Sequence, residues 1–286
     1  MNSFAEDMAL SRRIAEAVSA AGGRACYVGG FVRDALMGVE CKDIDIEVYG
    51  VAPQRLREVL STLGEVYDRG ASFGVLGLRH SDIDIAMPRT ESRTGLKHRD
   101  FDVSVDPFLE PREACRRRDF TINAMLQDVL SGEILDYYGG REDLAAGLIR
   151  RVNAETFVED ALRAFRGAQF AARLSAVIEP GTRALCAGMD VRALSQERVF
   201  AEMEKALLKA KKPSVFFSEL RSMDHLKEFF PEVEAMIAVP QNPKFHPEGD
   251  VFEHTMLTLD CAAALRERAE WPLGLMLSAL VHDIGK

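Results

Sequence analysis

Apolar residues follow a mixed strand and helix pattern in the first half of the chain. Residues Asp43 to Tyr49 alternate acidic with apolar or aromatic side chains, which is the period-two pattern of a half-buried strand. The acids of such a strand share one face. The patterns predict helices at 8–21, 31–37 and 53–63, and strands at 25–28, 43–49, 74–78 and 81–86. We therefore expect a small mixed sheet with helices in this half.

The second half has helical spacing almost throughout. Residues 88–118 are polar with weak periodicity and predict a long loop that is functional or mobile, and 121–129 predict a short helix or strand. From Arg141 onward, 3.6-residue spacing predicts helices at 158–174, 192–209 and 215–229. A proline-rich linker at 240–243 precedes a last helical stretch. We predict an α+β fold in three parts, 1–140, 141–240 and 241–286.

Composition narrows the class of protein. The 286 residues are 47% hydrophobic, which is ample for two or three globular cores. No apolar stretch reaches the length of a membrane span, and the acidic N-terminus lacks the features of a signal peptide, so we expect a cytoplasmic protein without membrane contacts. Five scattered cysteines argue against a disulfide framework. A net charge of −9 means that any nucleic-acid contact depends on local basic patches such as Arg116-Arg117-Arg118.

Two features of the first half suggest phosphate chemistry. The Gly29-Gly30 pair precedes a predicted helix, whose N-terminal N–H groups attract phosphate, although most such pairs are only tight turns. Asp43 and Asp45 project from one side of the next strand, and like charges held close together favour a cation such as Mg²⁺. The alternative is an exposed strand edge with solvated acids. The short separation of the two features favours a two-metal site for phosphoryl transfer.

Five motifs in order then resemble the class II tRNA nucleotidyltransferase and bacterial poly(A) polymerase family. They are Gly29 to Gly38 with Lys42 to Asp45, Arg117 to Met125, Asp136 to Gly140, Glu159 to Arg166, and Gln196 to Lys205. Residues His246 to Glu248, His254 and His282 to Lys286 are similar to the start of the HD-type phosphohydrolase domain of bacterial CCA-adding enzymes. The resemblance implies a polymerase-β-like head, a helical neck and body that bind the nucleotide base and RNA, and the beginning of a helical HD domain.

The resemblance also implies roles for individual residues. Asp43 and Asp45 would be catalytic ligands of Mg²⁺, and Asp84 is a possible third carboxylate. Asp160 and Arg163, expected on one helix face, would read the Watson–Crick edge of C or A. The other nucleotide-binding residues implied are Gly30, Arg33, Arg118, Asp119 and Arg166. A structural salt bridge is the alternative for Arg118 and Asp119.

The implied activity is transfer of CMP and AMP from CTP and ATP to the 3′ end of tRNA. Addition of poly(A), or of only CC or A, shares all of these motifs and stays open, and a catalytically idle RNA-binding module is a more distant alternative. The HD-like residues His254, His282 and Asp283 lack the further aspartate that such hydrolases need, so we expect no competent hydrolase site. The sequence gives no indication of oligomeric state.

Overall fold

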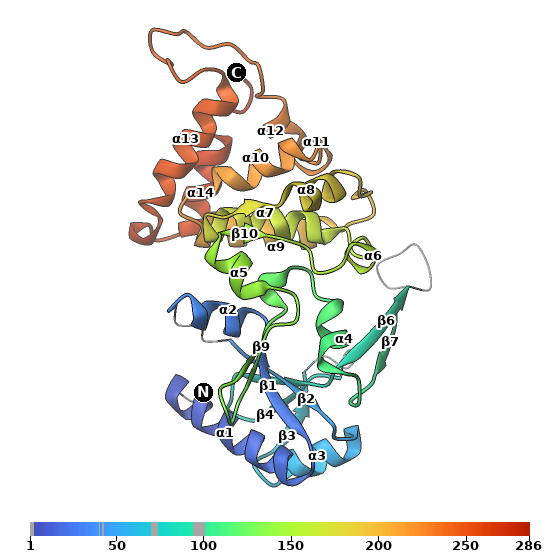
Figure 1. Ribbon diagram of the computed structural model, residues 1–286. Helices are drawn as coiled ribbons and strands as arrows, with labels where there is room; N and C mark the ends of the chain where they lie inside the picture. Colours follow the sequence, from blue (N-terminus) through green and yellow to red (C-terminus); the bar gives the residue numbers. More distant parts are fainter. Residues whose placement is uncertain (1–2, 40, 42, 70–73, 94–100) are drawn as a thin grey trace. The chain divides into compact units, whose positions relative to one another are not determined.

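The protein was analysed as a computed structural model that describes residues 3–39, 41, 43–69, 74–93 and 101–286. Contacts divide the chain into two compact units, Met1–Ala145 with Arg151–Phe157, and Ala146–Arg150 with Val158–Lys286. We call them the head unit and the helical unit, and Figure 1 gives the order of their elements. The further division expected near residue 240 stays a prediction.

The head unit is built on one seven-stranded mixed sheet. Its strand order is β3-β4-β5-β2-β1-β8-β9. Strands β2 and β5 pair in parallel, and every other neighbouring pair is antiparallel. The bounds are β1 Arg24–Val28, β2 Ile44–Tyr49, β3 Val66–Asp68, β4 Leu76–Leu78, β5 Ile83–Ala86, β8 Leu126–Asp128 and β9 Ile134–Leu135. The predicted mixed sheet and α+β fold are confirmed.

Side-chain alternation along β2 decides what each face of the sheet carries. Ile44, Ile46 and Val48 are almost fully buried in the main head core, together with residues of α1 (Phe4–Ala20) and α3 (Pro53–Ser61). Burial of each such aliphatic side chain stabilises the fold by roughly 1.5–3 kcal/mol. Asp45 and Glu47 therefore point to the opposite face, where a smaller core surrounds Tyr49. The apolar face fixes the register that presents the acids.

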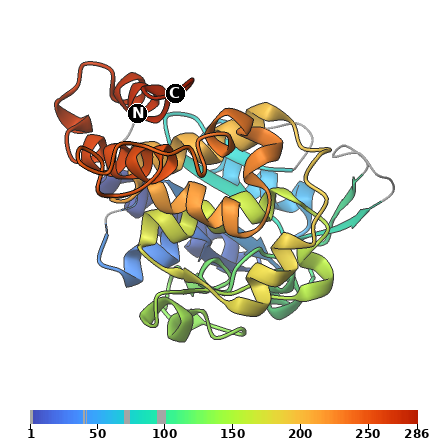
Figure 2. The ribbon, with the colours of Figure 1, turned by 90° about the horizontal axis from the view of Figure 1, so that it is seen from above.

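The polar segment 88–118 is not the long loop that the sequence predicted. It contains a two-stranded sheet, β6 (Arg89–Arg93) with β7 (Phe101–Val105), followed by helix α4 (Pro111–Arg116). The β6–β7 pair extends away from the main sheet (Figures 1 and 2). Residues 94–100 lie outside the described residues. The prediction was wrong because it overlooked the alternation of Phe101, Val103 and Val105 with two polar residues, which is a strand pattern inside an otherwise polar segment.

The helical unit packs its helices around an aromatic core. Helix α7 (Leu162–Leu174) contacts α9 (Gln196–Lys209) and α10 (Ser214–Ser222). Edge-to-face pairs join Phe165 to Phe229 and Phe216 to Phe217. The other elements are β10 Leu148–Ile149, β11 Val177–Ile178, α8 Pro180–Ala187, α11 Leu226–Phe229, α12 Pro231–Glu234, α13 Val251–Ala263, η2 Arg266–Arg268 and α14 Pro272–Val281. Among the described residues, no helix has the length and apolar character needed to cross a membrane.

Candidate active site

Two carboxylates at the start of β2 lack protein partners. Asp43 immediately precedes the strand and Asp45 lies within it, and both side chains have access to solvent. Within the described residues, neither carboxylate accepts a hydrogen bond or forms an ion pair. Although Asp45 has access to solvent, the atoms packed around it desolvate it in part, and this desolvation, with the charges of Asp84 and Asp43, raises its pKa to about 6 against the lowering effect of Arg118. This arrangement suits a cation, because oxygen ligands and excess negative charge are what Mg²⁺-type ions bind.

Asp84 lies directly beside Asp45. In the parallel β2–β5 pair the two residues are opposite each other in the register, and neighbouring strands are about 4.8 Å apart. One oxygen of Asp84 accepts a hydrogen bond from Arg69 Nη1 at 2.5 Å. The geometry therefore makes Asp84 available as a third carboxylate, while its role in binding metal stays a prediction.

The glycine turn lies next to an arginine of the second motif. Gly29 has φ +64°, which only glycine adopts readily, and it precedes helix α2 (Gly30–Leu36). A methyl group added at Gly29 would lie 3.6 Å from Arg118 Nη1. Arg118 Nη2 donates to Glu47 Oε2 at 3.1 Å, and the Tyr49 hydroxyl donates to the same oxygen at 2.6 Å. Glu47, absent from the sequence prediction, thus holds the guanidinium group against the turn.

Arg33 and Asp119, both predicted to contact nucleotide, belong to a buried hydrogen-bond network. The Arg33 side chain is 3% exposed and pairs with Asp34 at 2.7 Å. Its Nη1 donates to Asn123 Oδ1 at 2.6 Å, and Asn123 Nδ2 donates to Asp119 Oδ1 at 3.2 Å. The network joins α2 to the short 3₁₀ helix η1 (Thr121–Asn123). These contacts give both residues a structural role, and their contact with nucleotide stays a prediction.

The third motif forms a turn that starts helix α5 (Gly140–Ala145). Asp136 accepts hydrogen bonds from the N–H groups of Gly140 at 2.8 Å and Arg141 at 2.9 Å. A Cβ atom at Gly140 would lie 2.3 Å from the Thr121 carbonyl oxygen, so the position requires glycine. Thr121 is further held by its hydroxyl, which donates to Asp143 at 2.7 Å. The motif therefore fixes α5 against the 3₁₀ helix of the second motif.

The fourth and fifth motifs meet inside the helical unit. Arg198 of α9 donates to Asp160 Oδ2 at 3.0 Å. Helix α7 begins at Leu162, so the expectation that Asp160 and Arg163 share a helix face is wrong for Asp160. Asp160 instead precedes the helix and accepts the Leu162 N–H at 3.1 Å. The structural reason is that a carboxylate at this position satisfies an N–H group that the first helical turn leaves unpaired.

A second contact between these motifs involves a buried acid. Glu202 on α9 is 3% exposed, and its Oε1 lies 2.7 Å from Lys205 Nζ and 3.9 Å from Arg166 Nη1. The Arg166 guanidinium also lies 5.4 Å from the centre of the Phe170 ring. Arg166 therefore has partners within its own unit, and its predicted contact with the triphosphate is untested.

The histidines near the C-terminus gather into one cluster. Two overlapping groups have ligand atoms within 4.8 Å of one another, His246 with Glu248 and His254, and His254 with His282 and Asp283. Glu248 Oε1 lies 2.6 Å from His254 Nδ1. A backbone hydrogen bond, followed by those with His254 and His246, lowers the pKa of Glu248 to about 2. The structure thus brings together the three HD-like residues that the sequence singled out. Their function stays a prediction.

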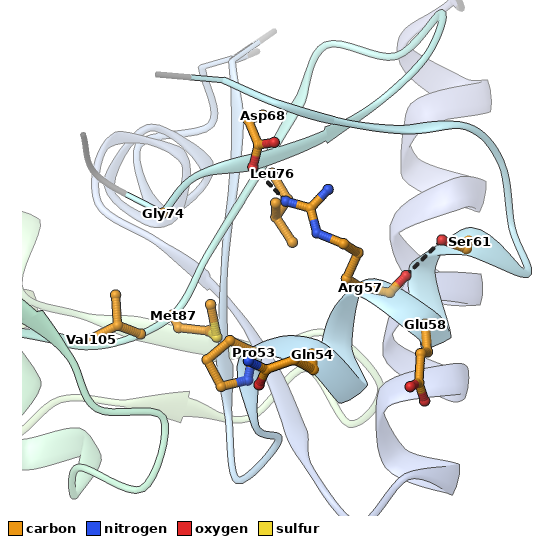
Figure 3. A pocket seen from close by; sticks show the side chains of 10 residues that line it. All are labelled: Pro53, Gln54, Arg57, Glu58, Ser61, Asp68, Gly74, Leu76, Met87 and Val105. Atoms are coloured by element: carbon orange, nitrogen blue, oxygen red, sulfur yellow. Dashed lines mark hydrogen bonds and ion pairs between the residues drawn. The ribbon is translucent and has the colours of Figure 1, made fainter. Parts of the chain in front are cut away.

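A pocket elsewhere in the head unit does not include any predicted site residue. It has a volume of about 510 Å³ and lies between α3 and the strands beside it, where Arg57 pairs with Asp68 (Figure 3). Its lining is Pro53, Gln54, Arg57, Glu58, Ser61, Asp68, Gly74, Leu76, Met87 and Val105. The carboxylates and the glycine turn therefore remain the candidate site.

Comparisons with known proteins agree with this geometry. Residues 25–150 match the family described as poly A polymerase head domain, and residues 178–237 match the family described as probable RNA and SrmB- binding site of polymerase A. A multifunctional CCA protein of Ralstonia nicotianae is 38% identical over 270 residues, which are 91% of this chain and 60% of that protein. The chain belongs to the poly(A) polymerase and class II tRNA nucleotidyltransferase family. It spans about three fifths of the length of the curated relatives that it matches. The family generally uses divalent metal ions.

Solved structures of family members have the same fold. The Thermotoga maritima CCA-adding enzyme, in complex with tRNA, is 25% identical with a TM-score of 0.67, over 95% of this chain and 62% of that chain. A CCA-adding enzyme in complex with CTP is 26% identical with a TM-score of 0.66, over 91% of this chain and 57% of that one. The corresponding complex with ATP is 26% identical with a TM-score of 0.67, over 96% of this chain and 62% of that one. The nucleotidyltransferase head is thereby confirmed.

Proposed function

We propose that the protein completes the CCA end of tRNA by transferring CMP and AMP from CTP and ATP to the RNA 3′-hydroxyl, with release of pyrophosphate. The observation that carries the proposal is the pair of unpartnered carboxylates, Asp43 and Asp45, beside the Gly29-Gly30 turn in a poly A polymerase head domain. Relatives that align with 91% of this chain at 38% identity are named multifunctional CCA proteins, which supports tRNA as the RNA substrate. The reaction would take place in the cytoplasm, where tRNA is processed.

The donor set fits Mg²⁺. Asp43 and Asp45 would hold the metal, with Asp84 as the possible third carboxylate, and carboxylate oxygens are the ligands that Mg²⁺ prefers. Bound Mg²⁺ would supply charge neutralisation at the triphosphate and at the attacking 3′-oxygen. The N–H groups at Gly29-Gly30 and the Arg118 guanidinium would bind phosphate oxygens. Glu47 would keep Arg118 oriented for this contact, given their 3.1 Å hydrogen bond.

Selection between C and A would depend on the helical unit. We propose that Asp160 and Arg163 present an acceptor and a donor fork to the base, while Arg166 contacts phosphate. Because Asp160 already pairs with Arg198 at 3.0 Å, Arg198 would either orient the carboxylate toward the base or give up its hydrogen bond to Asp160 when the base binds. The match of residues 178–237 to an RNA-binding region of polymerase A supports RNA contacts in this unit.

The alternatives are addition of poly(A), partial addition of CC or A, and an RNA-binding module without catalysis. The test is incorporation of each labelled nucleoside triphosphate on tRNAs that end before CCA, after C, and after CC, beside an unrelated RNA primer. CCA addition requires two C and one A on the first tRNA and no extension of complete tRNA. Long A tracts on any primer would favour poly(A) polymerase, and no incorporation with any primer would favour the idle module.

Asp45→Asn tests the metal assignment within the same assay. The substitution keeps the side-chain shape but removes a charge and a ligand oxygen, and we expect a loss of at least about 100-fold in rate with the fold intact. Asp68→Asn is the matched control, because Asp68 is an exposed strand residue whose one ion pair within the described part of the chain is with Arg57. Turnover of Asp45→Asn similar to that of the control would rule out the carboxylate assignment.

A further inference from the structure

Arg69 has a guanidinium group whose three nitrogen atoms are all engaged. Its Nε donates to the Tyr67 hydroxyl at 2.6 Å, and its Nη2 donates to the Ser81 carbonyl oxygen at 2.6 Å. The remaining nitrogen, Nη1, donates to Asp84 Oδ1 at 2.5 Å. Two of these partners belong to the scaffold, because Tyr67 lies within β3 and Ser81 shortly before β5. The planar group is therefore held in one orientation before it meets the carboxylate.

Asp84 needs such a partner because it faces another acid. It lies opposite Asp45 in the parallel register of β2 and β5. Mutual repulsion of the two carboxylates contributes to the raised pKa of Asp45, second only to burial. Arg69 supplies positive charge to one oxygen of Asp84. Among the described residues, the second oxygen of Asp84 has no hydrogen-bond partner.

We infer that Arg69 is a positioning residue that fixes the rotamer of Asp84, so that the second oxygen is presented to a divalent cation shared with Asp45. The inference rests on the metal assignment in the proposed function. Groups that hydrogen-bond a metal ligand orient it, and their removal typically weakens metal binding by 10- to 100-fold. Arg69 would thus act on the cation through Asp84.

The opposite hypothesis is that Arg69 and the cation compete for Asp84, so that Arg69 leaves Asp84 when metal binds. The anchoring contacts argue against it, because metal binding at Asp84 leaves the Tyr67 hydroxyl and the Ser81 carbonyl in place to hold the guanidinium. A role confined to the stability of the strand pair is the third reading. A purely structural role of this kind would leave the affinity for metal unchanged.

The experiment measures Mn²⁺ affinity by electron paramagnetic resonance, without nucleotide or RNA. All proteins carry His254→Ala, because His254 belongs to both histidine-containing groups that could also take a metal ion. Arg69→Ala, Asp84→Ala and the double variant form a cycle. We expect Arg69→Ala to weaken Mn²⁺ binding by about 10-fold, Asp84→Ala to weaken it at least as much, and Arg69→Ala to have no further effect when Asp84 is absent.

Arg79→Ala is the matched control. Arg79, which follows β4, forms an ion pair at 2.5 Å with Glu65, which precedes β3. No contact of Arg79 with Asp45 or Asp84 is seen among the described residues. The Mn²⁺ affinity of Arg79→Ala should equal that of the parent. Thermal unfolding followed by circular dichroism should verify that every variant is folded. Tighter Mn²⁺ binding by Arg69→Ala would support competition and overturn the inference. Unchanged Mn²⁺ affinity of Arg69→Ala would also overturn the inference. So would an equal loss of affinity when Arg69→Ala is added to Asp84→Ala.

These outcomes are separate from failure of the proposed function. Nucleotide transfer is not part of the readout, so a protein that binds Mn²⁺ through Asp84 and Arg69 but incorporates no nucleotide would leave the inference standing and reject the proposed reaction. If the parent binds no Mn²⁺ at this site, both the metal assignment and the inference are wrong.

Discussion

The buried pair of Arg33 and Asp34 gives the sharpest test of how the head unit is held together. Replacement of Arg33 by Met keeps most of the side-chain volume and removes the charge. Asp34, whose side chain is 8% exposed, would lose its charged partner, and Asn123 would lose a donor at 2.6 Å. If Arg33 mainly bound nucleotide instead, the substitution would change affinity and leave stability nearly intact.

The expected cost follows from burial. Removal of one member of a buried ion pair costs about 3–5 kcal/mol, because the other charge loses its compensating partner away from water. The exposed pair of Arg12 and Glu16 on α1, 65% and 56% exposed, provides the comparison. Such a helical pair contributes about 0.3–0.5 kcal/mol, so Arg12→Met should be close to neutral.

Urea unfolding followed by circular dichroism measures the free energy of unfolding of both variants. Hydrogen exchange of peptides from α2 and from α7 then assigns the loss to the head or to the helical unit. We expect faster exchange in α2 of Arg33→Met and unchanged exchange in α7. A loss below about 1 kcal/mol, together with weaker binding of CTP, would refute the structural assignment and support direct contact with nucleotide.

Two further substitutions test the motifs. Arg163→Ala should remove donors from the base edge at a cost of about 1–3 kcal/mol, so that UTP and GTP enter at rates closer to those of CTP and ATP in a four-nucleotide competition; a uniform rate loss with unchanged selectivity would contradict base reading. Gly140→Ala should destabilise the head by about 1–3 kcal/mol, because its Cβ would lie 2.3 Å from the Thr121 carbonyl oxygen. Gly188→Ala, whose Cβ would have its nearest contact at 3.5 Å, is the control in thermal unfolding, and equal melting temperatures would reject the argument.

Local pattern was sufficient for much of the head unit. The alternation in 43–49 predicted the strand β2 and the polar face that carries Asp45, because side chains of a strand alternate regardless of what pairs with it. Asp43 lies just before the strand. The glycine pair likewise predicted the turn before α2, since Gly29 has a positive φ that other residues rarely adopt. The helical spacing after residue 141 predicted the change to a mainly helical unit for the same local reason, although it missed the short strands β10 and β11.

Only the tertiary structure decided which distant residues meet. Arg69 is separated from Asp84 by 15 positions and Arg33 from Asn123 by 90, and neither pair follows from periodicity. The same holds for the contact of Arg198 with Asp160, which are 38 positions apart. Periodicity fixes the face on which a side chain lies, whereas strand order and helix packing decide what that face meets. The sequence by itself therefore determined the acids and the glycine turn of the candidate site, and the fold determined the side chains that orient them.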